Sequence, residues 1–276
     1  MVVRPDLSQR VGLSKSLLTA FDLCNAKAWN SKWHRRPFIP NPKVAFGNAV
    51  DAGVETLVTY HRMGQEPDMS RAFESGLEAG SKDGIDIDYA EVNGALEDWE
   101  AKVAPDFDFT HAITQHHFHL PLEDWGEADG HPDLILQADE DNIYDVKTAG
   151  RRKETARTLE LGFYALAREA ETGRPVREVG YMTRVRLVKP YWQVVTTFVD
   201  DAFRNWTRAR VSAFVRADRL DDLVQARRAA HDLAPQNQTM PGGPKNNGLC
   251  FGCEYSPKLG GNCELAVLEP LPGGDE

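Results

Sequence analysis

Long apolar runs are missing from this sequence, and none approaches the ~20 residues that a membrane-spanning helix requires. The first residues, MVVRPDLSQRVG, lack the apolar core of a secretory signal peptide, so we expect a cytoplasmic protein without a membrane partner. Cysteine is scarce, with 4 among 276 residues, and structural disulfides are rare in the cytoplasm. The cysteines are therefore expected to be metal ligands or inert thiols.

Positive charge is in deficit, because 32 basic residues face 42 acidic ones and the formal net charge is −10. Nonspecific affinity for nucleic acid across the whole surface is therefore not expected. A local basic groove is still compatible with this charge, since Lys and Arg cluster in residues 32–36, 149–157 and 183–189. A solvated surface of mixed charge is the alternative interpretation of these clusters.

Hydrophobic periodicity predicts an α/β protein. Helices are predicted over residues 15–31, with Ser14 as N-cap, and over 45–64, 68–81 and 88–103. The period then changes to two, which predicts strands over 111–122, 131–138, 142–148, 178–188 and 191–199, with a helix over 154–171. Further helices are predicted over 201–218 and 220–231. This order favours a small mixed sheet flanked by helices over a doubly wound sheet.

Three charged residues of the strand region form the main candidate site. Side chains two apart on a strand share a face, so Asp145 and Lys147 point the same way, and a hairpin would bring Asp133 beside them. Two carboxylates around one point suit a hard cation such as Mg²⁺ or Mn²⁺. A neighbouring lysine can orient or deprotonate a water and offset charge on a phosphate, as phosphodiester hydrolysis requires. Taken alone, an Asp-x-Lys pair is more often an ordinary polar strand face.

The cysteines form a three-plus-one pattern. Cys250, Cys253 and Cys263 lie near the end of the sequence, whereas Cys24 lies in the first predicted helix. Structural zinc sites usually have two close pairs of ligands, whereas this pattern has one pair and two isolated residues. The pattern therefore favours an iron–sulfur cluster over zinc.

The run HHFH at 116–119 is a weaker candidate. His117 and His119 would share one strand face, from which a zinc site is conceivable. A polar sheet face is the more common reason for such a run, and we assign no metal there.

Together these motifs resemble the PD-(D/E)-x-K nuclease superfamily, in particular its RecB-like branch, which includes iron–sulfur exonucleases associated with CRISPR adaptation and found in phages. The resemblance runs from about residue 13 to 264 and implies a restriction-endonuclease-like core. We expect a single nuclease domain over residues 1–276. Its parts are a mainly helical region (1–110) with the first cluster cysteine, a catalytic sheet core (111–200), helices (201–240) and an iron–sulfur segment (241–276).

The resemblance assigns ligands to two cofactors. Mg²⁺ or Mn²⁺ would be bound by Asp51, Asp133, Asp145 and the Val146 carbonyl, and one [4Fe–4S] cluster by Cys24, Cys250, Cys253 and Cys263. The family has a G-x-x-x-H motif with a histidine ligand. Here the motif runs from Gly47 to Asp51, so Asp51 stands where the family has its histidine. Aspartate is an acceptable ligand for a hard cation.

The resemblance also assigns catalytic roles. Lys147 would be the catalytic lysine. Glu160 and Tyr164 match a Q-x-x-x-Y motif with Glu in place of Gln, and they would line the active site or contact DNA. Four basic residues are candidates for DNA binding: Arg151, Arg152, Lys153 and Arg157.

The implied function is a metal-dependent exonuclease of a phage or prokaryote. It would hydrolyse single-stranded DNA or DNA ends in recombination, replication or CRISPR adaptation. Since no helicase motif accompanies it, a helicase, a recombinase or CRISPR adaptation proteins are the expected partners. The alternative is a weakened nuclease fold that holds DNA ends or a partner protein, although the intact Asp133, Asp145 and Lys147 favour the enzyme.

Overall fold

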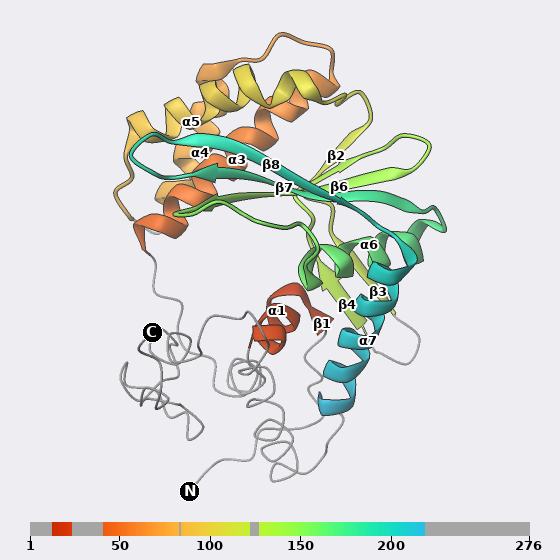
Figure 1. Cartoon of the computed structure of the whole chain (residues 1–276). Coiled ribbons are helices and arrows are strands. Elements are labelled where there is room, and N and C mark those ends of the chain that lie inside the picture. The colour runs from red at the N-terminus through yellow and green to blue at the C-terminus, as the bar shows by residue number, and fades with distance from the viewer. Residues whose placement is uncertain (1–12, 24–40, 83, 122–126, 219–276) are drawn as a thin grey trace, which may run out of the picture. The chain divides into compact units, whose positions relative to one another are not determined.

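The computed structural model describes residues 13–23, 41–82, 84–121 and 127–218 (Figure 1). These residues fall into two compact units. The first unit contains β1 (Leu13–Ser14), α1 (Lys15–Leu23) and the part of α7 (Asp201–Asp218) from Trp206 onward. The Ser14 hydroxyl accepts a hydrogen bond from the Leu17 amide at 3.4 Å, as predicted for an N-cap. The predicted helix over 220–231 lies outside the described residues, and the single nuclease domain stays a prediction.

Three helices of the second unit cover one face of its sheet: α3 (Pro42–Arg62), α4 (Met69–Ser81) and α5 (Tyr89–Lys102) (Figure 1). A 3-10 turn (Ala104–Asp106) follows. Helix α3 begins at Pro42, before the predicted start at residue 45, because Asn41 caps it and the fixed φ of proline suits the first turn of a helix. In the described part of the chain, no helix combines the length and the apolar character needed to cross a membrane.

The sheet has the strand order β2-β5-β6-β7-β8. Its strands are β2 (Ala112–Thr114), β5 (Leu134–Leu136), β6 (Asp141–Ala149), β7 (Val176–Val185) and β8 (Tyr191–Phe198). Strands β6 and β7 pair in parallel and the other neighbours pair antiparallel. Helix α6 (Leu159–Thr172) connects β6 to β7 across the other face (Figure 1). The predicted mixed sheet flanked by helices is confirmed, and it fits a restriction-endonuclease-like core.

The prediction of a single strand over residues 111–122 was wrong. Gln115 has a φ of 48°, which breaks the extended backbone into β2 and a separate strand, β3 (Phe118–Pro121). Strand β3 pairs with β4 (Glu127–Gly130), which the sequence did not predict. Helix α6 also begins later than predicted, because Thr158 caps it and accepts a hydrogen bond from the Leu161 amide.

Candidate active site

The hairpin of β5 and β6 brings Asp133, Asp145 and Lys147 together, as predicted. The antiparallel register pairs Leu134 with Tyr144, so Asp133 comes opposite Asp145. The Val146 amide donates a hydrogen bond to Asp133 Oδ2 at 2.7 Å, which fixes the carboxylate against β6. Tyr144 and Val146 belong to the core beneath the three helices, so Asp145 and Lys147 point to the opposite face, where α6 lies.

The Lys147 ammonium lies among the oxygens of this site. Its Nζ is 3.8 Å from Asp133 Oδ2 and 3.9 Å from Glu160 Oε1, and it forms an ion pair with Asp145. The same nitrogen donates to the Val146 carbonyl at 3.3 Å. The Asp145 side chain is fully buried and that of Lys147 is 30% exposed, so the pair interacts in an environment less polar than water.

Asp51 approaches the cluster from α3. One helical turn earlier, Thr148 Oγ1 lies only 3.2 Å from the point where a Cβ on Gly47 would stand. The missing side chain of Gly47 therefore allows α3 to pass close to β6. The Gln115 side-chain amide donates to Asp51 Oδ2 at 3.2 Å and holds the carboxyl group in place.

The pKa of Asp51 shows that it belongs to the same cluster. The pKa of Asp51 is raised from 3.8 to about 6, mainly by burial; Lys147 opposes this rise, and the negative charges of Asp145 and Glu55 contribute to it. The carboxyl groups of Asp51 and Asp145 thus repel each other, and a cation placed between them would lower the pKa of Asp51 again.

Helix α6 supplies Glu160 and Tyr164. Glu160 Oε2 accepts a hydrogen bond from the Tyr181 hydroxyl at 3.0 Å. Tyr164 is only 1% exposed, and its hydroxyl donates to the His131 carbonyl at 2.9 Å. Burial, followed by the charge of Asp145, raises the pKa of Tyr164, so the hydroxyl remains a donor. This burial favours a role in positioning the segment before Asp133 over a contact with DNA.

Sequence reasoning missed several partners of the cluster. Tyr181 lies opposite Asp145 in the parallel register of β6 and β7, and its hydroxyl also contacts Thr158 Oγ1 at 2.8 Å. Gln115 lies at the break between β2 and β3. No local motif marks either residue, since each reaches the site through the pairing of distant segments.

The basic residues that follow β6 differ in the contacts of their side chains. Arg151 and Arg152 are exposed, so their guanidinium groups present positive charge to solvent. Lys153 Nζ lies 4.4 Å from the centre of the Tyr181 ring, a cation–π contact next to Glu160.

Arg157, the last of these basic residues, is also exposed, but its guanidinium contacts other side chains of the protein. Its Nη2 is 3.1 Å from Asp200 Oδ1, and its guanidinium lies 5.1 Å from the centre of the Phe203 ring. Its charge is therefore already matched by a carboxylate, in contrast to the solvent-facing charge of Arg151 and Arg152.

The predicted cluster ligands Cys24, Cys250, Cys253 and Cys263 all lie outside the described residues. The donors that the structure does describe around Lys147 are carboxylates and the Val146 carbonyl. Such oxygen donors fit a hard divalent cation better than a soft one.

Comparison with known proteins shows the family of this chain. Among proteins with curated descriptions, none matches the chain. The crystal structure of a protein from Eubacterium rectale that is provisionally named an exonuclease matches 91% of this chain and 99% of its own, with a TM-score of 0.50 and 13% identity, which shows likeness of fold alone. The crystal structure of SSO0001 covers 91% of this chain and 96% of its own at 14% identity, but its TM-score of 0.32 carries no argument. The model of the PD-(D/E)XK nuclease superfamily matches residues 13–257, and the chain therefore belongs to that superfamily.

Proposed function

We propose that this nuclease is a Mg²⁺- or Mn²⁺-dependent exonuclease of the RecB-like branch, acting on single-stranded DNA or DNA ends. The observation that carries the proposal is the position of the Lys147 ammonium, which lies no farther than 3.9 Å from the carboxylates of Asp133, Asp145 and Glu160. A lysine beside clustered carboxylates is the arrangement that metal-assisted phosphodiester hydrolysis requires. Nucleases of this superfamily generally use divalent metals.

The side chains divide the chemistry between them. Asp51, Asp133, Asp145 and the Val146 carbonyl would hold the metal, which supplies charge to neutralise the phosphate and to lower the pKa of a water molecule. Lys147 orients the attacking water and offsets the negative charge that develops on the phosphate. The water oxygen loses a proton and forms a bond to phosphorus, while the bond to the leaving nucleotide oxygen breaks and that oxygen takes up a proton.

The proposal includes a [4Fe–4S] cluster held by Cys24, Cys250, Cys253 and Cys263, and its support is the spacing of these residues. The partners proposed beside DNA are a helicase, a recombinase or CRISPR adaptation proteins. The processes they imply are recombination, replication and CRISPR adaptation.

The test is degradation of end-labelled DNA by anaerobically purified protein, with Mg²⁺, Mn²⁺ or EDTA. Linear single-stranded DNA should be degraded with either metal and left intact in EDTA, whereas circular single-stranded DNA should resist an exonuclease. Asp145→Ala should lose cleavage and metal binding together. Asp139→Ala changes an exposed carboxylate in the turn between β5 and β6 and should cut like the wild type.

Two results would contradict the proposal. Cleavage of circular DNA as fast as linear DNA would replace the exonuclease by an endonuclease. A wild-type protein that binds DNA but cuts nothing in either metal would support the binding module instead.

A further inference from the structure

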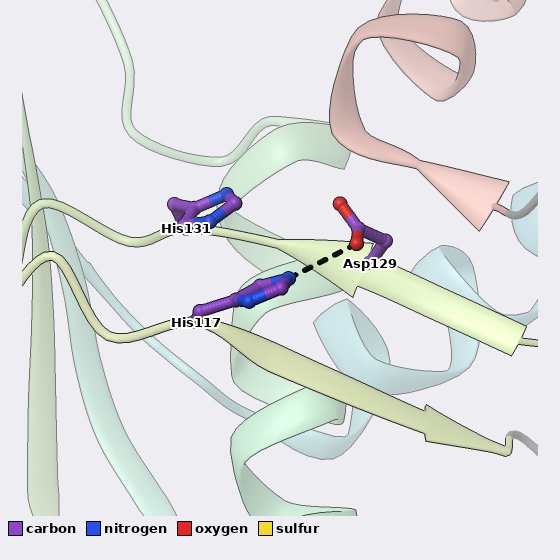
Figure 2. Close-up of side chains that lie close together, drawn as sticks. All are labelled: His117, Asp129 and His131. Atoms are coloured by element: carbon purple, nitrogen blue, oxygen red, sulfur yellow. Dashed lines mark hydrogen bonds and ion pairs between the residues drawn. The ribbon is translucent and has the colours of Figure 1, made fainter.

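A second group of metal-ligating side chains lies beside β3 and β4, two residues from Asp133. His117 directly precedes β3, Asp129 lies in β4 and His131 directly follows β4. Figure 2 shows the two imidazole rings on one side of the strand pair with the carboxylate at their edge. One ligand atom from each of the three residues lies within 4.8 Å of the others. Two histidines and an aspartate, from separate parts of the sequence, therefore surround one point.

The arrangement follows from the alternation of side chains along the two strands. Phe118 is 1% exposed and packs on the inner face, where its ring lies 5.9 Å from that of Tyr164. Gly130 lies opposite, and a Cβ there would come within 2.5 Å of Phe118 Cζ. Because Phe118 and Gly130 point inward, their neighbours His117, Asp129 and His131 point outward together.

The contacts among the three side chains already resemble a ligand set. His117 Nε2 lies 3.0 Å from Asp129 Oδ2, and the rings of His117 and His131 stack with their centres 4.1 Å apart and an angle of 10° between them. His119 Nδ1 lies 3.7 Å from the same carboxylate oxygen. Two imidazoles with one carboxylate leave a fourth position for water or for His119, as a tetrahedral zinc site needs.

We propose that His117, Asp129 and His131 form a site for a divalent transition metal of the zinc class. Imidazole nitrogen selects such metals, whereas Mg²⁺ prefers oxygen ligands alone. The site differs in donor chemistry from the oxygen cluster around Lys147. The two clusters therefore select different cations.

Metal binding at this site would also affect the neighbouring segment that carries Asp133. The Tyr164 hydroxyl holds the His131 carbonyl at 2.9 Å, and Pro132, whose φ is fixed by its ring, connects His131 to Asp133. A metal that fixes the His131 side chain would also fix the segment that carries Asp133. This effect on Asp133 rests on the proposed function, whereas metal binding at the histidines does not.

The experiment is a zinc titration of the full-length protein by calorimetry, with zinc content measured after dialysis. His117→Ala and His131→Ala are compared with the wild type, with His111→Ala, which changes another exposed histidine, and with Asp145→Ala. Both ligand histidines are exposed, so the substitutions remove little packing. Every variant retains the four cysteines, so zinc bound by thiols cancels in the comparison.

The wild type and His111→Ala should each bind one more zinc ion than His117→Ala and His131→Ala, with a Kd of about 10 μM or tighter. Millimolar Mg²⁺ should not displace this ion, and zinc should raise the Tm of the wild type more than that of the two variants. Equal zinc stoichiometry in the wild type and the histidine variants would overturn the proposal. So would loss of this ion in Asp145→Ala alone. The zinc stoichiometry does not depend on nuclease activity. The proposed function and the proposed zinc site are therefore tested independently.

Discussion

The backbone amide of Val146 donates a hydrogen bond to the carboxylate of Asp133 at 2.7 Å, which joins the two strands of the candidate active site. Because the donor belongs to the main chain, side-chain substitutions elsewhere in the cluster leave this bond in place. Asp133 is thus positioned by the register of β5 and β6 itself. Substitutions at the other residues of the cluster therefore test catalysis while Asp133 keeps its position.

Lys147→Ala should retain metal binding but lower cleavage by about 10²- to 10³-fold, because the lysine acts on the water and on the developing phosphate charge. It should also destabilise the metal-free protein, since Asp145 is fully buried and would lose its cationic partner. Mg²⁺ should then raise the Tm of Lys147→Ala more than that of the wild type. The measurements are single-turnover cleavage and thermal unfolding, with the exposed Lys189→Ala as control. Cleavage at the wild-type rate by Lys147→Ala would contradict the enzymatic role.

Asp51→Asn should stabilise the metal-free protein at neutral pH. Burial raises the folded-state pKa of Asp51 to about 6, so between about pH 4 and pH 6 the folded protein binds more protons than the unfolded chain. Stability is therefore lost as the pH rises through this interval, and the neutral amide of the variant avoids that loss. In EDTA at pH 7.5 the variant should be more stable by about 1–3 kcal/mol, and the difference should vanish near pH 4.

Denaturant unfolding at the two pH values measures this effect, with Asp139→Asn as an exposed control. A variant no more stable than the wild type at pH 7.5 would show that the Asp51 carboxyl group is not desolvated. With saturating Mg²⁺ the order should reverse, since only the carboxylate is a strong ligand for the ion.

Cys24→Ala should remove the iron–sulfur cluster. The anaerobically purified wild type should be brown, with a broad absorbance near ~400 nm from thiolate-bound iron. The variant should lose this colour and unfold at a lower temperature. Iron, sulfide and zinc analysis measures the outcome, and a colourless wild type with an equivalent of zinc would replace the cluster by a zinc site.

Arg151→Ala with Arg152→Ala should weaken DNA binding and reduce its dependence on salt, by about one unit of slope for each phosphate that the protein no longer neutralises. Arg157→Ala is the matched control, because its guanidinium already pairs with Asp200. It should change the slope little. Binding isotherms at several salt concentrations decide the matter, and an unchanged slope in the double variant would mean that these arginines are merely solvated.

Local patterns predicted the features that depend on neighbouring residues. One such feature is the placement of Asp145 and Lys147 on the same strand, and another is the turn before β6. Both agree with the structure. The break at Gln115 was missed, since a single residue with positive φ leaves no mark in the hydrophobic period. The histidine and aspartate cluster beside β3 and β4 was missed for another reason. Asp129 and His131 meet His117 only through strand pairing, whereas the sequence offered His119 as its partner.

The ammonium of Lys147 occupies the place among the acidic side chains where a divalent ion is expected. Under the proposed function, this ammonium would take the place of the divalent ion until the ion binds. A newly made chain can complete this part of its fold before it meets any metal, because the lysine already holds the carboxylates together. Under the proposed function, metal binding would exchange one cation for another among these carboxylates, and the displaced ammonium would turn toward the incoming phosphate.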